Sequence, residues 1–182
     1  MTTGRMTKTA AAAAAMAGAL CLAGAASAAE YPIGEAVEQN GMEIGAVYLQ
    51  PVVMAPEQPG MNVQTDVHLE ADIHALPKNP NGFGPGDWVP YLGITYRLEK
   101  LGSDWQGFGS FMAMVADDGP HYGANVKLDG PGKYRLTYRI NPPSYQGFYR
   151  HTDKETGVAE WWKPFTVSWE FAFTGVGKKG TY

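Results

Sequence analysis

The sequence predicts an all-β protein, an immunoglobulin-like antiparallel β-sandwich. Beyond residue 28, no apolar pattern repeats at helical spacing with capping residues. Instead, seven short runs of β-branched and aromatic residues follow one another, and turn-forming residues separate them. Seven short strands within residues 29–182 are the number and spacing expected of an immunoglobulin-type sandwich.

Each predicted strand is rich in residues that favour extended backbone. The turn signals LGSD, DDGP and DGPG lie between the later runs. In chain order the runs are EIGAVYLQPVVM (43–54), VQTDVHLEADIHAL (63–76), WVPYLGITYRLEK (88–100), FGSFMAMVA (108–116), YGANVKL (122–128), KYRLTYRI (133–140) and PFTVSWEFAFTG (164–175).

Two prolines and one connecting segment qualify this pattern. Pro51 and Pro90 lie inside predicted strands, and because proline cannot donate a ladder hydrogen bond, we expect edge strands or bulges there. Residues 75–88 (ALPKNPNGFGPGDW) are rich in Pro, Gly and Asn, so they predict a long ordered loop between two strands.

The first 28 residues have the layout of a secretory signal peptide. Arg5 and Lys8 precede an apolar run of mostly Ala and Gly, which ends in an Ala-Ser-Ala cleavage site. The alternative is a single membrane anchor, but no charged stop follows the run. Cys21 stands in a poor context for lipid attachment. We therefore expect cleavage after residue 28, one domain over residues 29–182, a periplasmic location and no covalent membrane anchor.

Charge and cysteine content exclude several classes of function. Residues 1–28 contain two basic and no acidic residues, so their removal takes the formal net charge from −4 to −6. A net negative chain of this kind is not expected to bind nucleic acid. The one cysteine, Cys21, leaves with the signal peptide. The remaining chain therefore has no disulfide, no blue-copper thiolate and no cysteine-based zinc site.

The stretch TDVHLEADIHAL (65–76) carries the strongest chemical signal. Its polar positions are all acidic or imidazole, whereas the polar face of an ordinary strand also carries Thr, Lys or Ser. His68 and Glu70 are two residues apart, so on a strand they project from the same face, roughly 7 Å apart. They can bind one metal ion together, although the alternative, an exposed polar face, is the commoner explanation of such a pattern.

A second stretch, MAMVADDGPHYGANV (112–126), adds a thioether and an imidazole. The turn DDGP can bring Met114 and His121 together at the end of a sheet. Asp117 and Asp118 lie on that turn, where aspartate commonly bonds to its own backbone. Methionine also fills hydrophobic cores well, so a packing role for Met114 remains the alternative.

The other two histidines give weaker signals. His151 lies in a polar loop, and such a histidine is more often a surface residue than a ligand. Nothing places His74 at a site. Imidazole, thioether and carboxylate ligands together favour copper, because thioether selects soft Cu(I) while imidazole and carboxylate also suit Cu(II).

Five blocks resemble a known family. NGMEIGAVYLQPV, DVHLEADIHAL, NPNGFG..W.PYL, MVADDGPHYGANV and GFYRHTDKETGV..WW.PF are similar, in this order, to periplasmic iron-transport proteins encoded beside high-affinity iron permeases. The treponemal metal-binding lipoprotein antigen is a more distant member. The resemblance covers about residues 30–175. It implies an immunoglobulin-like homodimer that binds copper and assists an inner-membrane iron permease in iron uptake.

The resemblance also implies a ligand set, and the residue types in that set suggest a mechanism. Asp118 would be a nearby carboxylate or alternative ligand, and no role is carried over to His74. Copper cycling between Cu(I) and Cu(II) would change the oxidation state of iron, the transported ion, for which Asp66, Asp72, Asp117 and Asp118 are candidate ligands. The implied copper ligands are His68, Glu70, Met114, His121 and His151.

Three functions remain open from the sequence. The first is a copper-dependent component of iron uptake. The second is a periplasmic copper trafficking or storage protein that does not act on iron. The third is an adhesion or scaffold sandwich with incidental histidines. No pairing of a nucleophile with a base is apparent, so the sequence does not favour a hydrolase.

Overall fold

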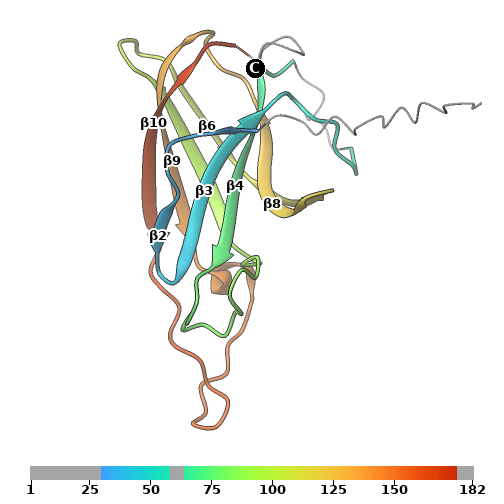
Figure 1. The fold of residues 1–182 in the computed structure, drawn as a ribbon, viewed down its shortest axis with the longest axis vertical. Coiled ribbons are helices and arrows are strands. Elements are labelled where there is room, and N and C mark those ends of the chain that lie inside the picture. The colour runs from blue at the N-terminus through green and yellow to red at the C-terminus, as the bar shows by residue number, and fades with distance from the viewer. Residues whose placement is uncertain (1–29, 58–63, 176–182) are drawn as a thin grey trace, which may run out of the picture.

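The predicted sandwich is confirmed. A computed structural model describes residues 30–57 and 64–175, which form two antiparallel sheets packed face to face (Figure 1). The predicted signal peptide, residues 1–28, lies outside the described residues. Within the described part of the chain, no helix has the length and apolar character needed to cross a bilayer.

The two sheets differ in size. One contains six strands in the order β1-β3-β4-β8-β7, with β2 paired to β3, and the other contains four in the order β10-β9-β5-β6. A single turn of 3-10 helix, η1 (Pro143–Gln146), precedes the segment that leads to β10. The strands are β1 (Tyr31–Pro32), β2 (Val37–Gln39), β3 (Met42–Leu49), β4 (Val67–Ala75), β5 (Gly93–Lys100), β6 (Gln106–Ser110), β7 (Met112–Ala116), β8 (Gly119–Val126), β9 (Gly132–Asn141) and β10 (Phe165–Phe173).

The core lies between the sheets and is built from the apolar positions of each alternating strand. Leu69, Ala71 and Ile73 of β4 face it and are almost completely buried. From the opposite sheet, Tyr138 enters the core and its hydroxyl donates a hydrogen bond of 2.8 Å to the backbone oxygen of Glu70. The central strand β4 is therefore tied to both neighbours and to the facing sheet.

The predicted strand 108–116 is in fact two strands in different sheets. β6 belongs to the four-stranded sheet and β7 to the six-stranded sheet, and the chain crosses between them at Phe111. The Phe111 ring packs in the core against Tyr96 and Tyr138, with ring centroids 5.2 Å away in both cases. This crossing places Met114 in the same sheet as His68.

The expectation of edge strands or bulges at Pro51 and Pro90 is wrong. β3 ends at Leu49 and β5 begins at Gly93, so both prolines lie outside the strands. Proline stops the ladder here instead of distorting it, because its nitrogen has no hydrogen to donate. The long loop predicted over residues 75–88 is confirmed between β4 and β5.

Candidate metal centre

Strand register brings the candidate ligands onto one face of the six-stranded sheet. β4 pairs with β8 so that Glu70 lies opposite Gly123, and β7 pairs with β8 so that Met114 lies opposite His121. Directly paired residues of antiparallel strands project from the same face, as do residues two apart on one strand. His68, Glu70, His121 and Met114 therefore all project from the face that points away from the core.

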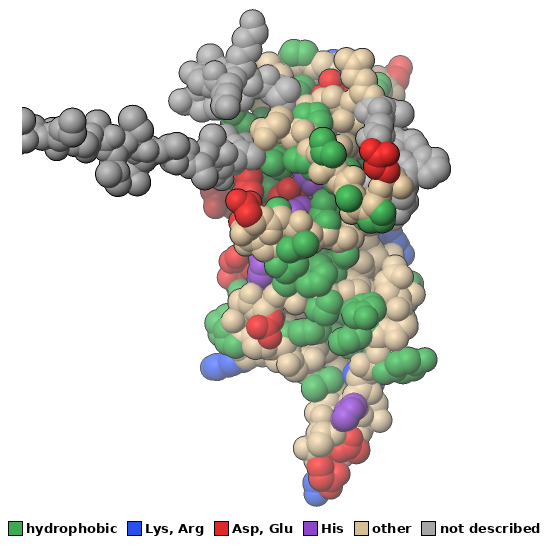
Figure 2. All heavy atoms as spheres, turned by 90° about the vertical axis from the view of Figure 1, so that its right-hand side faces the viewer, with side chains coloured by type: hydrophobic (Ala, Val, Ile, Leu, Met, Phe, Trp, Pro, Cys, Tyr) green, Lys and Arg blue, Asp and Glu red, His purple; other side chains and the backbone are tan. Residues whose placement is uncertain are grey.

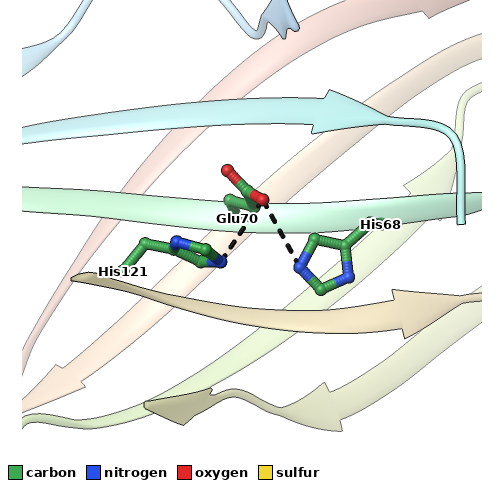
Figure 3. Close-up of side chains that lie close together, drawn as sticks. All are labelled: His68, Glu70 and His121. Atoms are coloured by element: carbon green, nitrogen blue, oxygen red, sulfur yellow. Dashed lines mark ion pairs between the residues drawn. The ribbon is translucent and has the colours of Figure 1, made fainter. Parts of the chain in front are cut away.

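Glu70 lies between two imidazoles (Figure 3). Its Oε1 atom is 3.4 Å from Nε2 of His68 and 3.4 Å from Nε2 of His121. All three side chains are buried, with exposed fractions of 1% for His68, 6% for Glu70 and 5% for His121. The alternative of an exposed polar face is therefore wrong for this part of β4. One potential ligand atom from each residue lies within 4.8 Å of the others.

The two Nε2 atoms have an unusual environment. Both are buried and neither has a hydrogen-bond partner among the described residues. Buried polar atoms are nearly always hydrogen-bonded, and in a cluster of metal-binding groups a bound ion is one way to satisfy the exceptions. Two imidazole nitrogens beside one carboxylate oxygen form the start of a metal coordination shell, so these residues fit a metal.

A cavity of about 550 Å³ opens beside this cluster. Met114 of β7 lines it together with Asp117 and Asp118 of the turn that follows β7. Met54, from the segment that follows β3, lines the same cavity. Figure 2 shows histidine and acidic side chains together on this face, among hydrophobic ones. The cavity thus contains two imidazoles, one buried carboxylate and two thioethers.

The cavity is electrostatically prepared for a cation. Burial, with the nearby charges of Asp72, Glu30 and Asp118, raises the pKa of Glu70 to about 8. Burial likewise raises the pKa of Asp72, and burial with a hydrogen bond to Asp118 raises the pKa of Glu30. Burial lowers the pKa of His68. Crowded carboxyl groups that resist ionisation alone are stabilised in their charged form by a metal ion.

Two residues that sequence reasoning did not single out shape the site. The Asn125 amide oxygen is 2.9 Å from Nδ1 of His68. A side chain at Gly123 would collide with the same ring, because its Cβ atom would lie 2.6 Å from Nε2 of His68. Alternation with His121 places both residues on the ligand face, so the YGANV stretch contained a usable signal.

His151 is not part of this cluster. Its side chain is 74% exposed, and its Nδ1 atom is 2.7 Å from the Thr156 hydroxyl. The segment between η1 and β10 that carries it extends from the end of the sandwich where β4 finishes, whereas His68 lies near the start of β4 (Figure 1). His74 pairs with Trp88 in an isolated bridge and lies outside the cluster as well.

Comparison with known proteins identifies the family. The family model described as "Fe2+ transport protein" matches residues 27–175. The chain belongs to the Fe2+ transport protein family. A UPF0423 protein of Brucella abortus is 55% identical over 169 residues, which cover 90% of this chain and 92% of the relative. The 34 kDa membrane antigen of Treponema pallidum is 42% identical over 154 residues, which cover 81% of this chain and 75% of the antigen.

Solved structures with this fold include two members with similar sequences. FetP of uropathogenic Escherichia coli strain F11 is 56% identical, with a TM-score of 0.78 over 82% of this chain and 99% of FetP. Copper-reconstituted P19 of Campylobacter jejuni is 51% identical, with a TM-score of 0.78 over 82% of this chain and 99% of P19.

In metal-free protein, Glu70→Gln should raise the thermal midpoint at pH 9 and change it little near pH 5. The pKa of Glu70 lies near 8 when folded and near its ordinary value of 4.5 when unfolded. The stability of the wild type therefore falls as pH rises between these values, because only the unfolded chain readily releases the proton. Glutamine is neutral at every pH and removes this loss.

Calorimetry of chelator-treated protein across this pH range measures the difference between the two proteins. Glu38→Gln is the matched control, because Glu38 is exposed on β2 and its replacement should change the midpoint little. An identical pH dependence in wild type and Glu70→Gln would show that Glu70 ionises freely and that the cavity does not hold it protonated.

Gly123→Ala should weaken Cu(II) binding roughly 10–100-fold, the usual effect of changes just outside a metal's ligands. The added methyl group must displace the His68 ring, since their separation would be 2.6 Å. Gly45→Ala on β3 is the control, because its Cβ would meet nothing closer than 3.6 Å. Competition titration gives the affinities and circular dichroism checks the fold. Unchanged affinity in a folded Gly123→Ala protein would exclude Nε2 of His68 as a ligand atom.

Proposed function

We propose that this protein is a periplasmic copper-binding component of iron uptake that serves an inner-membrane iron permease. One observation carries the proposal: two buried imidazole nitrogens without hydrogen-bond partners flank the Glu70 carboxylate in a cavity that Met114 also lines. Nitrogen, oxygen and thioether donors together suit copper in both oxidation states. Membership of the Fe2+ transport protein family supports the link to iron.

The solved relatives support copper as the resident metal. P19 has been crystallised in copper-reconstituted form, and three of its copper-bound variants replace a glutamate, a methionine and an aspartate. These are the residue types of Glu70, Met114 and Asp118 at the present cavity. FetP was expressed in the periplasm, which agrees with the secretory signal expected for residues 1–28.

In this proposal the copper ligands are His68, Glu70, Met114 and His121. The Met114 thioether is soft and uncharged, so it favours Cu(I), while the Glu70 carboxylate is hard and anionic and favours Cu(II). Bound copper would supply one-electron transfer to or from iron. Glu70, whose pKa is near 8, would give up its proton when a cation binds. The net charge of the cavity would then rise by one unit less than the charge of the metal ion.

Iron, the substrate, would approach through the acidic rim of the cavity. Glu30, Asp117 and Asp118 line the cavity beside the copper ligands and offer the oxygen atoms that hard cations prefer. Asp66, another candidate from the sequence, is engaged elsewhere. Its carboxylate accepts a hydrogen bond of 2.8 Å from the Leu128 backbone and pairs with Lys127 at 3.1 Å.

A second copy of the chain would supply the remaining ligand, His151. Within one chain the segment between η1 and β10, which carries His151, extends from the end of the sandwich where β4 finishes, whereas His68 and Glu70 lie in the first half of β4 (Figure 1). The face that carries the cavity also carries hydrophobic side chains, which extend toward the projecting end at the bottom of Figure 2. Val115 is 75% exposed and Tyr149 is 92% exposed. Pairing two such faces about a twofold axis would bring each copy's His151 toward its partner's cavity.

Copper trafficking or storage without iron is the competing function. The donor set itself is compatible with it, since imidazole and thioether ligands hold copper without any need for iron. Growth in iron-limited medium separates the two functions. Deletion of the protein should impair growth there if it serves iron uptake, and should leave that growth unchanged if it only carries copper.

Met114→Leu should weaken Cu(I) binding by roughly tenfold or more, about 1.4 kcal/mol, and Cu(II) binding less. Glu70→Gln should do the reverse, because glutamine lacks the anionic charge that favours the divalent ion. Both substitutions approximately keep side-chain volume, which limits packing effects. Chelator competition with each ion, anaerobically for Cu(I), measures the affinities. Unchanged Cu(I) affinity in Met114→Leu would show that Met114 only packs.

The protein should sediment as a dimer, and His151→Ala should lose copper affinity without losing the dimer. Mixed subunits provide the decisive measurement. When His151→Ala and His68→Ala chains are refolded together, each mixed dimer regains one complete site, because intact His68 and His151 then meet across the interface. Absence of regained binding in the mixture, or a monomer at all micromolar concentrations with and without copper, would contradict a shared site.

A further inference from the structure

The side chain of Asn125 connects the metal cluster to the segment that follows β3. Its Oδ1 atom accepts a hydrogen bond of 3.2 Å from the Val52 backbone nitrogen and lies 2.9 Å from Nδ1 of His68. Its Nδ2 atom donates a hydrogen bond of 2.8 Å to the Val52 backbone oxygen. One amide group thus contacts a copper ligand and both polar groups of a residue in the cavity wall.

These contacts determine which nitrogen of His68 carries hydrogen. A backbone N–H only donates and a backbone carbonyl only accepts, so Val52 fixes the orientation of the Asn125 amide. The amide atom facing His68 is then the oxygen, which can only accept. Neutral His68 must therefore carry its hydrogen on Nδ1, which leaves the lone pair of Nε2 free on the side of Glu70.

We propose that Asn125 is the positioning residue of the copper site, and that it couples His68 to the wall formed by residues 50–57. Val52 and Met54 of this segment line the cavity. β4 and β8 place His68 directly opposite Asn125, so a single cross-strand pair makes the connection. The proposal rests on the proposed function for the identity of the metal, but its structural part holds for the metal-free chain.

The coupling between the metal and the wall follows from the way a bound cation polarises the His68 ring. A cation at Nε2 withdraws electron density from the ring and makes Nδ1–H a stronger donor to Asn125. Hydrogen bonds in a chain strengthen one another, so the amide becomes a stronger donor to Val52 in turn. Metal binding should therefore tighten the wall, and by linkage a loosened wall should weaken metal binding.

Two substitutions separate the functions of the amide. Asn125→Leu removes every polar contact and keeps the branching of the side chain, while Asn125→Asp keeps an oxygen acceptor for His68 and for the Val52 N–H and loses the donor to the Val52 oxygen. Thr137→Val is the control. Thr137 on β9 and Ser168 on β10 both belong to the four-stranded sheet, which does not carry the metal cluster, and the substitution removes the hydrogen bond of 2.8 Å between their hydroxyl groups. Thermal midpoints establish that each variant is folded.

The first measurement uses metal-free protein. Long-range ¹H–¹⁵N NMR should show hydrogen on Nδ1 of His68 in the wild type and in Asn125→Asp, and a mixture of tautomers in Asn125→Leu. Amide exchange at Val52 should accelerate in Asn125→Leu, which removes the acceptor of the Val52 N–H, and stay unchanged in Thr137→Val. A wild-type spectrum with hydrogen on Nε2, or Val52 exchange unaffected by Asn125→Leu, would overturn the proposal whether or not the protein binds copper.

The second measurement adds metal. Cu(I) should slow Val52 exchange in the wild type and not in Asn125→Leu, and Asn125→Leu should bind Cu(II) roughly 10–100-fold more weakly. Equal Cu(II) affinity in wild type and Asn125→Leu would overturn the positioning role. If neither protein bound copper while the metal-free results held, the proposed function would fail and the tautomer assignment would stand.

Discussion

The structure depends on one constraint: strand β4 is buried on both faces although one of them is polar. Its apolar residues enter the core, its edges pair with β3 and β8, and its polar face is covered around His68 and Glu70. Burying a carboxyl group and two imidazoles is costly because each loses water, and the Nε2 atoms of both rings have no hydrogen-bond partner among the described residues. The raised pKa of Glu70 reflects that cost, and a metal ion is the partner that removes it.

The sequence predicted those features that depend on local periodicity. Alternation identified the sandwich and placed His68 and Glu70 on one face, and the turn after Met114 brought it to His121. Burial of that face depends on β7 and the segment after β3, which are distant in sequence. The crossing at Phe111 escaped prediction because alternation continues through it, and the very short β1 and β2 carry too few residues for a pattern.

The site's supporting residues were invisible for a different reason. Gly123 and Asn125 matter only because the register sets them opposite Glu70 and His68. Register follows from long-range pairing, and a shift of one residue would turn the same side chains away from the cavity. The resemblance named His151 as a ligand, but no property of a single folded chain explains that role, since the residue lies beyond reach of the cavity.

The crossing of the chain between the two sheets at Phe111 affects how readily the metal site opens. β7 is an edge strand of five residues with a hydrogen-bonded neighbour, β8, on one side only. Strands of this kind open locally at a much smaller free-energy cost than the whole domain. With Phe111 fixed in the core, β7 can peel from β8 and return in register. Opening of β7 would withdraw Met114 from the cavity and leave Glu70 and the two histidines on β4 and β8 in place, so the fraying of one edge would set how often the cavity opens on that side.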